Sequence, residues 1–267
     1  MLFADQNLAR RLEVANALEG VDYARAHAKR FPYIGSTSMQ IMGGYAIFAG
    51  VDSPLTQAFG LGLSGAVTEA EVDDLEEFFN FHEAPTNIEL CPLADPGLLE
   101  MLMKRGYRVL EYSNVLFHQL GEIPTQNSEV SVRIPNNYED NLWARVVSLG
   151  FVPMEEPEPM MLEITVTMFH SEASVPFLVE LDGQPAGGGG LFLHKEIADC
   201  YGHATLQDFR GRGVQTALIQ TSLAHAKKNN CEVVMATTMP GTTSQRNFER
   251  QGFRIAYTRT KLTNAKI

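Results

Sequence analysis

The chain has 267 residues, of which 45% are hydrophobic and 20% are charged, and its formal net charge is -11. A chain of this length accommodates two domains of ordinary size. The acidic charge argues against nucleic acid as the main partner, because such binding depends on Lys and Arg side chains that neutralise phosphates.

The composition also argues against a membrane protein and a secreted protein. No apolar run reaches the roughly 18 residues of a membrane-spanning helix, and the first residues lack the basic start and apolar stretch of a signal peptide. The three cysteines, Cys91, Cys200 and Cys231, are odd in number and far apart. This spacing is not that of a disulfide framework or a metal site, so we expect a cytoplasmic protein without a bound metal.

The N-terminal half predicts helices connected by turn-rich segments. Residues 5–29 have helical periodicity. A further helix is expected from Glu69 to His82, because Thr68 and Glu71 have the spacing of a capping box. A third, Leu98 to Lys104, follows an Asp-Pro turn.

One N-terminal segment has the spacing of a dinucleotide-binding fingerprint. Residues 60–65 spell G-x-G-x-x-G, and Glu89 follows 24 residues after Gly65. A dinucleotide site requires a strand just before Gly60 and a helix that opens at Gly65. The capping box instead places the start of the helix at about Thr68. We therefore expect no dinucleotide here, although a nicotinamide-dependent enzyme remains an alternative.

The C-terminal half predicts alternating strands and helices. Two strands joined by an Asp-Gly turn are followed by a strand, a helix and a further strand, which indicates a mixed sheet in an α/β domain. The expected helices are Tyr138 to Leu149, Met161 to Phe169, a helix that ends at Lys228, and Thr243 to Arg250. The expected strands are Phe177 to Leu181, Ala186 to His194, Ile197 to Leu206, Val233 to Thr237 and Phe253 to Leu262.

The two halves have the same order of elements. Residues 105–109 resemble residues 251–255, and 146 residues separate Gly106 from Gly252. The same shift places Gly65 on Gly211 and brings the helices that follow them into register. We infer a duplication with domains at residues 1–124 and 129–267, joined by the polar, turn-rich segment from Glu122 to Ser128.

The segment from Leu206 to Leu218 carries the strongest functional signal. A strand runs into a loop with two glycines and two arginines, and the loop opens a helix. Free backbone N–H groups and the positive end of the helix dipole make such a site suitable for an anion. Gly211 and Gly213 allow the backbone to approach a pyrophosphate, and Arg210 and Arg212 add positive charge.

This loop resembles the acetyl-CoA pyrophosphate motif of the GNAT N-acetyltransferases. The run Arg-Gly-Arg-Gly-Val at 210–214 is a common spelling of that motif, although Gln215 stands where the family has Gly or Ala. Residues 244–253 resemble the family's next motif, a helix that ends in Gly-Phe. The resemblance implies an α/β fold of two tandem GNAT-like domains.

The N-terminal copy lacks the features that bind the cofactor in the family. The positions that match the motif, residues 64–71, contain no Arg, and acidic residues follow at the start of the helix. This charge stabilises the helix dipole but repels a pyrophosphate. We therefore expect a degenerate N-terminal copy beside a C-terminal copy that binds acetyl-CoA.

The resemblance implies an N-acyltransferase that moves acetyl from acetyl-CoA to a primary amine of a small molecule or peptide. A main-chain N–H near Leu206 would polarise the thioester carbonyl. The implied cofactor contacts are Thr205, Leu206, Arg210, Gly211, Arg212, Gly213, Val214, Gln215, Thr216 and Asn247. The oligomeric state stays open.

The catalytic groups are less well defined. Many family members carry a Tyr acid four residues before the Gly of Gly-Phe, and this position is Phe248 here. Tyr257 is the substitute acid that we consider, and His203 the base, because its ordinary pKa suits proton transfer. The glutamates at 155, 156 and 158 are candidates to hold a cationic amine. The missing Tyr keeps an alternative open, a non-catalytic sensor that binds acyl-CoA.

Overall fold

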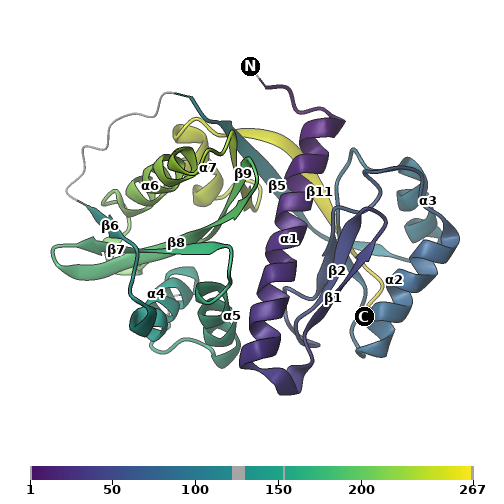
Figure 1. Ribbon diagram of the computed structural model, residues 1–267, viewed down its shortest axis with the longest axis horizontal. Helices are drawn as coiled ribbons and strands as arrows, with labels where there is room; N and C mark the ends of the chain where they lie inside the picture. Colours follow the sequence, from purple (N-terminus) through teal and green to yellow (C-terminus); the bar gives the residue numbers. More distant parts are fainter. Residues whose placement is uncertain (1, 122–129, 153, 266–267) are drawn as a thin grey trace. The chain divides into compact units, whose positions relative to one another are not determined.

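The structure, a computed structural model, describes residues 2–121, 130–152 and 154–265 and divides the chain into two compact units (Figure 1). Among these residues, the first unit contains those up to Val115, Thr238–Pro240 and those from Ile255 onward. The second unit contains Leu116–Thr237 and Gly241–Arg254. The predicted linker from Glu122 to Ser128 lies outside the described residues.

The first unit combines a small sheet with three helices. Its strands lie in the order β1-β2-β3-β4-β11-β5. Its elements are α1 (Gln6–Arg30), η1 (Pro32–Ile34), β1 (Thr37–Ile41), β2 (Gly44–Phe48), β3 (Gln57–Phe59), α2 (Glu69–Phe81), β4 (Asn87–Leu90), α3 (Pro96–Lys104), the first part of β5 (Arg108–Gln119), and β11 (Arg254–Thr263) from its second residue. The segment 5–29, predicted to be helical, corresponds to the single helix α1, with Asp5 as its N-cap.

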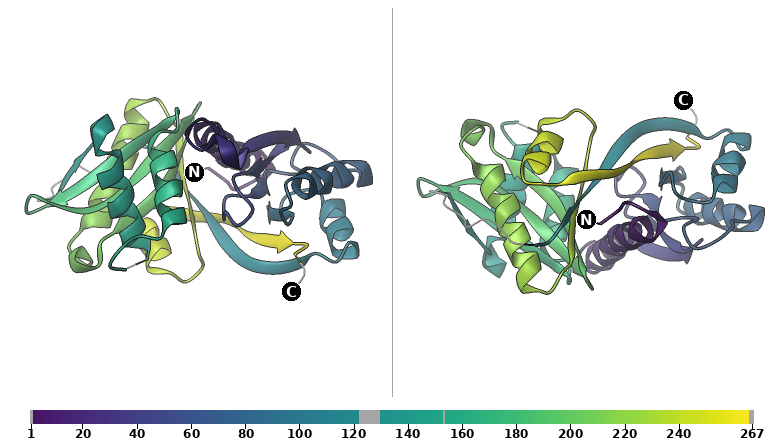
Figure 2. Two further views of the ribbon diagram at one scale, coloured as in Figure 1. Left: turned by 90° about the horizontal axis from the view of Figure 1, so that it is seen from below. Right: turned by 90° about the horizontal axis from the view of Figure 1, so that it is seen from above.

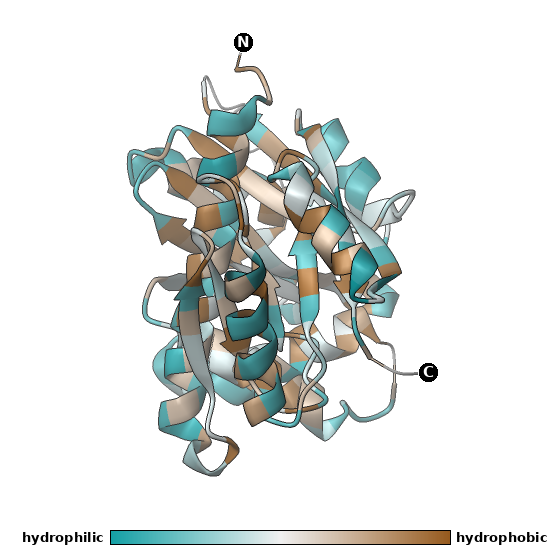
Figure 3. Ribbon diagram, turned by 90° about the vertical axis from the view of Figure 1, so that its right-hand side faces the viewer, coloured by the Kyte–Doolittle hydropathy of each residue, from teal (hydrophilic) through white to brown (hydrophobic). Residues whose placement is uncertain are grey.

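The helices of the first unit cover both faces of its sheet (Figure 2). Successive side chains of a strand point to opposite faces. Ala46 and Phe48 accordingly share a buried cluster with residues of α2 and α3. Ile47 lies between them in sequence and packs against Ala17 and Ala24 of α1. Hydrophilic and hydrophobic residues alternate around the helices on this side of the molecule, as amphipathic packing requires (Figure 3).

The second unit has a longer sheet with the order β5-β10-β9-β8-β7-β6. The pairs β6/β7, β7/β8 and β8/β9 are antiparallel, whereas β9 and β10 are parallel. Its elements are the end of β5, β6 (Ser131–Arg133), η2 (Asn137–Glu139), α4 (Asp140–Phe151), α5 (Pro159–Phe169), β7 (Ser174–Leu181), β8 (Gln184–His194), β9 (Ile197–Thr205), η3 (Gln207–Phe209), α6 (Val214–Lys228), β10 (Val233–Thr238) and α7 (Thr243–Arg250).

A run of glycines in β8 lets helices pack closely on both faces of this sheet. A Cβ atom on Gly187 would lie 2.7 Å from Val214 Cγ1 of α6, and one on Gly188 would lie 3.0 Å from Val147 Cγ2 of α4. These two glycines are neighbours in a strand, so α4 and α6 lie on opposite faces (Figure 1).

The structure confirms the tandem architecture predicted from the sequence repeat. The shift of 146 residues maps α2, β4, α3 and β5 onto α6, β10, α7 and β11 with ends that agree within two residues. The same shift does not place β1 on its counterpart β7, because β7 and β8 form a longer hairpin than β1 and β2 do.

The two units exchange their last strands. β11 closes the chain, yet it pairs with β4 in the first unit, with Thr260 opposite Leu90 and Leu262 opposite Ile88. β5 in turn enters the second unit at Leu116 and lies beside β10 there. The units therefore differ from the predicted ranges 1–124 and 129–267 in the place of the final strand. Within the described part of the chain, no helix has the length and apolarity needed to cross a bilayer.

Candidate functional site

The parallel strands β9 and β10 of the second unit separate before β9 ends. β9 pairs with β10 only from Ile197 to Cys200, opposite Val233 to Ala236. Further along, β9 keeps its antiparallel pairing with β8, in which Ala204 lies opposite Gly188 and Thr205 opposite Gly187. The end of β9 consequently has a strand partner on one side, and its other edge is available for hydrogen bonds to a ligand.

A β-bulge directs one side chain of β9 into this opening. The register with β8 shifts between Gly188 and Gly190, and Gly202 on β9 has a φ of +64°. Bulges commonly redirect a side chain next to a functional site. A Cβ atom on Gly189 would lie 2.6 Å from His203 Cδ2, so the imidazole occupies the space that the missing side chain leaves.

The loop after β9 leaves the start of α6 without a side-chain cap. Its N-cap residue is Gly213, with a φ of +85°, and no side chain accepts a hydrogen bond from the first turn. Gly211 also has a positive φ, +77°, a conformation that favours glycine. The first-turn N–H groups of a helix have no acceptor within the helix. They therefore form an anion-binding group at the positive end of the helix dipole.

The two arginines of the loop have different surroundings. Arg210 donates from Nη2 to the Gly150 carbonyl oxygen at 3.1 Å, which ties the loop to the last turn of α4. Arg212 forms an ion pair with Asp182 at 2.6 Å and lies over the ring of Phe209. Only Arg210 of the two lines the cavity described next.

A cavity of about 550 Å³ lies between this loop, the end of β9 and α7. Most of the residues predicted to contact the cofactor line it, and so does His203. The lining residues are Gly150, Phe151, His203, Ala204, Thr205, Phe209, Arg210, Gly211, Gly213, Val214, Gln215, Thr216, Thr243, Ser244, Asn247 and Arg250. Leu206 and Arg212 are not among them.

Sequence reasoning missed α4 and, apart from Asn247, the residues of α7 that line this cavity. Gly150 and Phe151 end α4, while Thr243, Ser244 and Arg250 share a face of α7 with the predicted Asn247. The helical spacing of 243, 247 and 250 was available in the sequence, since such residues lie on one side of a helix. The position of α4 results from long-range packing and had no local signal.

Gln215 bridges the two helices that border the cavity. Its Oε1 accepts a hydrogen bond from Asn247 Nδ2 at 2.5 Å, and its Nε2 lies 3.5 Å from Ser244 Oγ. A long amide thus occupies the position at which the motif has Gly or Ala, and it fixes the orientation of Asn247.

His203 lies on the wall of the cavity in a largely apolar setting. Its ring stacks on Phe248, with ring centroids 5.6 Å apart, and Nε2 lies 3.5 Å from Ser222 Oγ. Its Nδ1 atom is buried. Desolvation by burial lowers the pKa of His203 to about 4, and a hydrogen bond with the Gly190 backbone opposes this shift in part. The imidazole is therefore neutral at physiological pH and retains a nitrogen lone pair.

Tyr257 lies in the first unit, apart from the residues that line the cavity. Its hydroxyl donates to Glu13 Oε1 at 2.9 Å, and Arg259 Nε donates to the same oxygen at 2.7 Å. Burial, followed by the charge of Glu13, raises the pKa of Tyr257 well above its ordinary value. The phenol is thus protonated, with its proton engaged by a carboxylate of its own unit.

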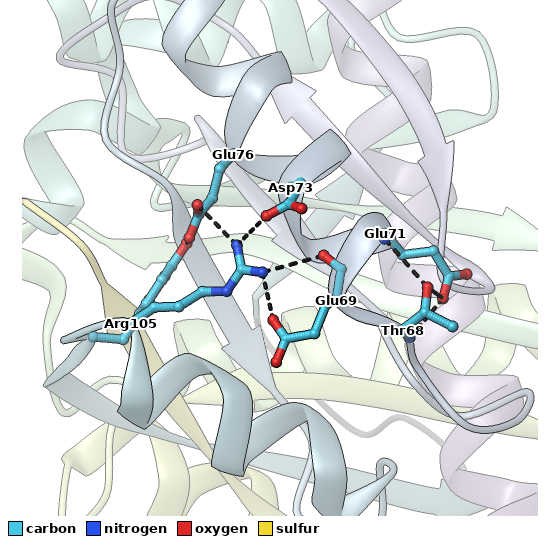
Figure 4. Close-up of polar contacts among 7 residues, drawn as sticks. Thr68, Glu69, Glu71, Asp73, Glu76 and Arg105 are labelled. Atoms are coloured by element: carbon cyan, nitrogen blue, oxygen red, sulfur yellow. Dashed lines mark hydrogen bonds and ion pairs between the residues drawn. The ribbon is translucent and has the colours of Figure 1, made fainter.

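In the first unit the position equivalent to the loop is filled by the protein's own side chains (Figure 4). Thr68 and Glu71 form the predicted capping box at the start of α2. Because α2 begins at Glu69, the helix required at Gly65 for a dinucleotide is absent from the described structure. Asp95 Oδ2 accepts a further hydrogen bond, from the Val67 N–H at 2.8 Å.

A basic residue also engages the acidic side chains of α2. Arg105 contacts Glu69 at 2.5 Å, Asp73 at 2.6 Å and Glu76 at 3.1 Å (Figure 4). The start of this helix, which lacks a side-chain cap in the second unit, is thus capped in the first, and its acidic side chains are paired. The described residues include no group of His, Cys, Asp or Glu arranged to hold a metal.

Comparisons with known proteins agree with this geometry. A model of the acetyltransferase (GNAT) family matches residues 143–253, which contain the cavity loop and α7. No curated protein matches the chain.

Solved structures with low sequence identity share the fold over most of the chain. A GCN5-related N-acetyltransferase from Kribbella flavida has a TM-score of 0.66 at 16% identity, covering 91% of this chain and 96% of its own. A tandem GNAT protein from the clavulanic acid biosynthesis pathway has a TM-score of 0.59 at 13% identity, covering 98% and 96%. A GCN5-related N-acetyltransferase from Sphaerobacter thermophilus has a TM-score of 0.58 at 15% identity, covering 78% and 71%. The chain therefore has the tandem GNAT fold, and residues 143–253 within it match the acetyltransferase (GNAT) family.

Proposed function

We propose that the second unit is an N-acyltransferase site that moves acetyl from acetyl-CoA to a primary amine of a small molecule or peptide. The uncapped start of α6, which opens beside Arg210 onto the cavity at the end of β9, carries this proposal. The first unit then serves as a scaffold, because its equivalent helix start is capped by Thr68 and Glu71.

The second unit fits the donor in charge and in size. The cavity wall contains two arginines, Arg210 and Arg250, and no Asp or Glu is among its lining residues. The volume lies within the roughly 300–1,000 Å³ of small-molecule sites. The pyrophosphate is assigned to the amides of residues 211–216 with Arg210, and Arg212 contributes charge from outside the cavity. The pantetheine arm is assigned to the free edge of β9 at Thr205 and Leu206, and Asn247 lines the opposite wall.

Acetyl-CoA supplies an activated acyl group as a thioester. In the transfer, the amine nitrogen forms a bond to the carbonyl carbon, the bond from that carbon to sulfur breaks, and the sulfur leaves as a thiolate. The proton lost by the amine must reach a base, and the thiolate must gain a proton. We assign the base to His203, because its neutral ring lines the cavity. The role of Tyr257 as the acid stays a prediction. The hydrogen bond from its hydroxyl to Glu13 does not favour this role.

A non-catalytic acyl-CoA sensor is the second candidate. The observation in its favour is Phe248, a buried ring at the position where many family members carry the Tyr acid. The two functions differ in one product, since an enzyme releases free thiol from acetyl-CoA when an amine is present and a sensor does not. A thiol assay with a panel of amines separates them.

Titration calorimetry with acetyl-CoA tests whether the second unit binds the donor. We expect one site per chain, no heat with NADH, and a Kd at least about tenfold weaker for Arg210→Glu, since the change reverses a charge that faces the pyrophosphate. Lys228→Glu, at the far end of α6, makes the same change of charge outside the cavity and should bind like the native chain. Two sites per chain would contradict the assignment of the first unit as a scaffold, and equal binding by the Arg210 variant would contradict the proposed site.

A further inference from the structure

One face of α7 forms a wall of the cavity from end to end. Thr243 and Ser244 start this face, Asn247 lies in its middle, and Arg250 ends it. A helix rises 1.5 Å per residue, so Arg250 lies about 10 Å along the wall from Thr243. The cavity therefore has a cation at the far end of this wall.

Hydrogen bonds between α6 and α7 show where this cation lies relative to the start of α6. Gln215, in the first turn of α6, contacts Asn247 and Ser244. Gln220, one turn further on, donates to Gln251 Oε1 at 3.0 Å. Arg250 precedes Gln251 and so lies beyond the first turn of α6. Arg210 lies before that turn, so the two cations stand at different places along the cavity.

The guanidinium of Arg250 has no ion pair or hydrogen bond within the described parts of the chain. This is unlike Arg212, which pairs with Asp182, and Arg210, which binds the Gly150 carbonyl. The neighbouring carboxylate of Glu249 accepts from Gln245 on the same helix at 2.9 Å. Arg250 is exposed at the cavity and available to an anion.

The donor assigned to this cavity has three phosphate groups, two in its pyrophosphate and one on the 3′ oxygen of its ribose. The start of α6 and Arg210 account for the pyrophosphate. A guanidinium recognises a phosphate with two parallel hydrogen bonds. We propose that Arg250 binds the ribose 3′-phosphate and gives the site a preference for coenzyme A over 3′-dephospho-coenzyme A. This inference rests on the proposed function of the second unit.

Titration calorimetry of the full chain with coenzyme A and with 3′-dephospho-coenzyme A tests the proposal. We expect the native chain to prefer coenzyme A by about tenfold, the range of one charge-assisted contact to phosphate. Arg250→Gln should lose this preference by weakening coenzyme A alone, and its affinity for the dephosphorylated ligand should stay that of the native chain. Arg250→Lys keeps the charge and should retain part of the preference.

Arg246→Gln is the matched control, because it removes the same charge one turn earlier on α7, outside the cavity lining. It should keep the full preference. A native chain that binds both ligands equally, or an Arg250→Gln variant that keeps the preference, would overturn the role of Arg250 while leaving the donor site intact. A native chain that binds neither ligand would overturn the proposed function together with this inference.

Discussion

The buried imidazole of His203 links the stability of the second unit to its proposed chemistry. The β-bulge at Gly202 and the missing side chain of Gly189 place the imidazole against Phe248. An apolar contact of this kind disfavours the charged form of the ring. The protein thus keeps a neutral imidazole in the cavity, and protonating that ring works against folding.

The shifted pKa of His203 predicts a loss of stability in mild acid. The pKa is about 4 in the folded chain and near 6.5 in an unfolded one. Between these values the unfolded state binds more protons, so stability is fully present above about pH 6.5 and falls as the pH decreases toward 4. The loss attributable to this group is at most about 3 kcal/mol.

Urea unfolding at a series of pH values measures this effect. His203→Gln keeps a polar side chain of similar reach without a titrating group, and its stability should change less between pH 6.5 and pH 4 than that of the native chain. The other histidines are common to both proteins and cancel in the difference. Parallel pH curves for the two proteins would show that His203 is not the group responsible.

At the scale of elements, α2 and α6 are equivalent helices of the two copies, and they differ in how their first turns are capped. α2 begins with a capping box and acidic residues, whereas α6 begins with a glycine and no side-chain cap. A capped start stabilises the fold, and an uncapped start leaves donors for a ligand. The difference between the two copies therefore lies in how each satisfies the first amides of one helix.

Removing the cap of α2 should reduce stability without affecting the donor site. Thr68→Ala removes the side chain that accepts from the Glu71 N–H at 3.3 Å, at a cost of about 1 kcal/mol in the free energy of unfolding. Chemical denaturation measures the cost, and calorimetry should give an unchanged Kd for acetyl-CoA. A change in Kd beyond the experimental error would mean that the first unit contributes to donor binding.

Local patterns explain why the helices and the loop were predictable. The capping box and the helical periodicity gave the start of α2, and α7 extends over the predicted residues, Thr243 to Arg250. The Gly-Arg loop predicted one contiguous part of the cavity lining, residues 210, 211 and 213–216. The unit to which β11 belongs was not predictable, since strand pairing joins residues far apart in the chain. The same holds for the bond from Tyr257 to Glu13, which spans nearly the whole sequence.

At the scale of the whole molecule, the exchange of strands makes each unit depend on the other half of the sequence. β11 brings Arg259 into the first unit, where it pairs with the fully buried Glu13 on α1. Leu262 from the same strand has no exposed surface. Without β11, the Glu13 carboxylate would be a buried charge without its cation, which costs several kcal/mol.

The exchange predicts that neither half of the chain folds alone. Residues 1–120 lack β11, and residues 130–267 lack the end of β5, so each half expressed separately should be insoluble or unfolded by circular dichroism. Expressed together with an affinity tag on one half, the two should purify as a complex that binds acetyl-CoA. As a control, a protease site is inserted after Gly121 and the full chain is cleaved there after it has folded. The two halves should then stay associated. A soluble, folded residue 1–120 fragment would contradict this prediction.

The position of β11 also reverses the usual order of folding during synthesis. Domains generally fold as they emerge, the N-terminal one first, but here the first 115 residues leave the ribosome without the strand that completes their sheet. The second unit, which receives β5 early, can form as soon as α7 has been made. The part of the protein translated first is thus finished only after the second unit, and loss of the strand from Ile255 onward damages the first unit rather than the second.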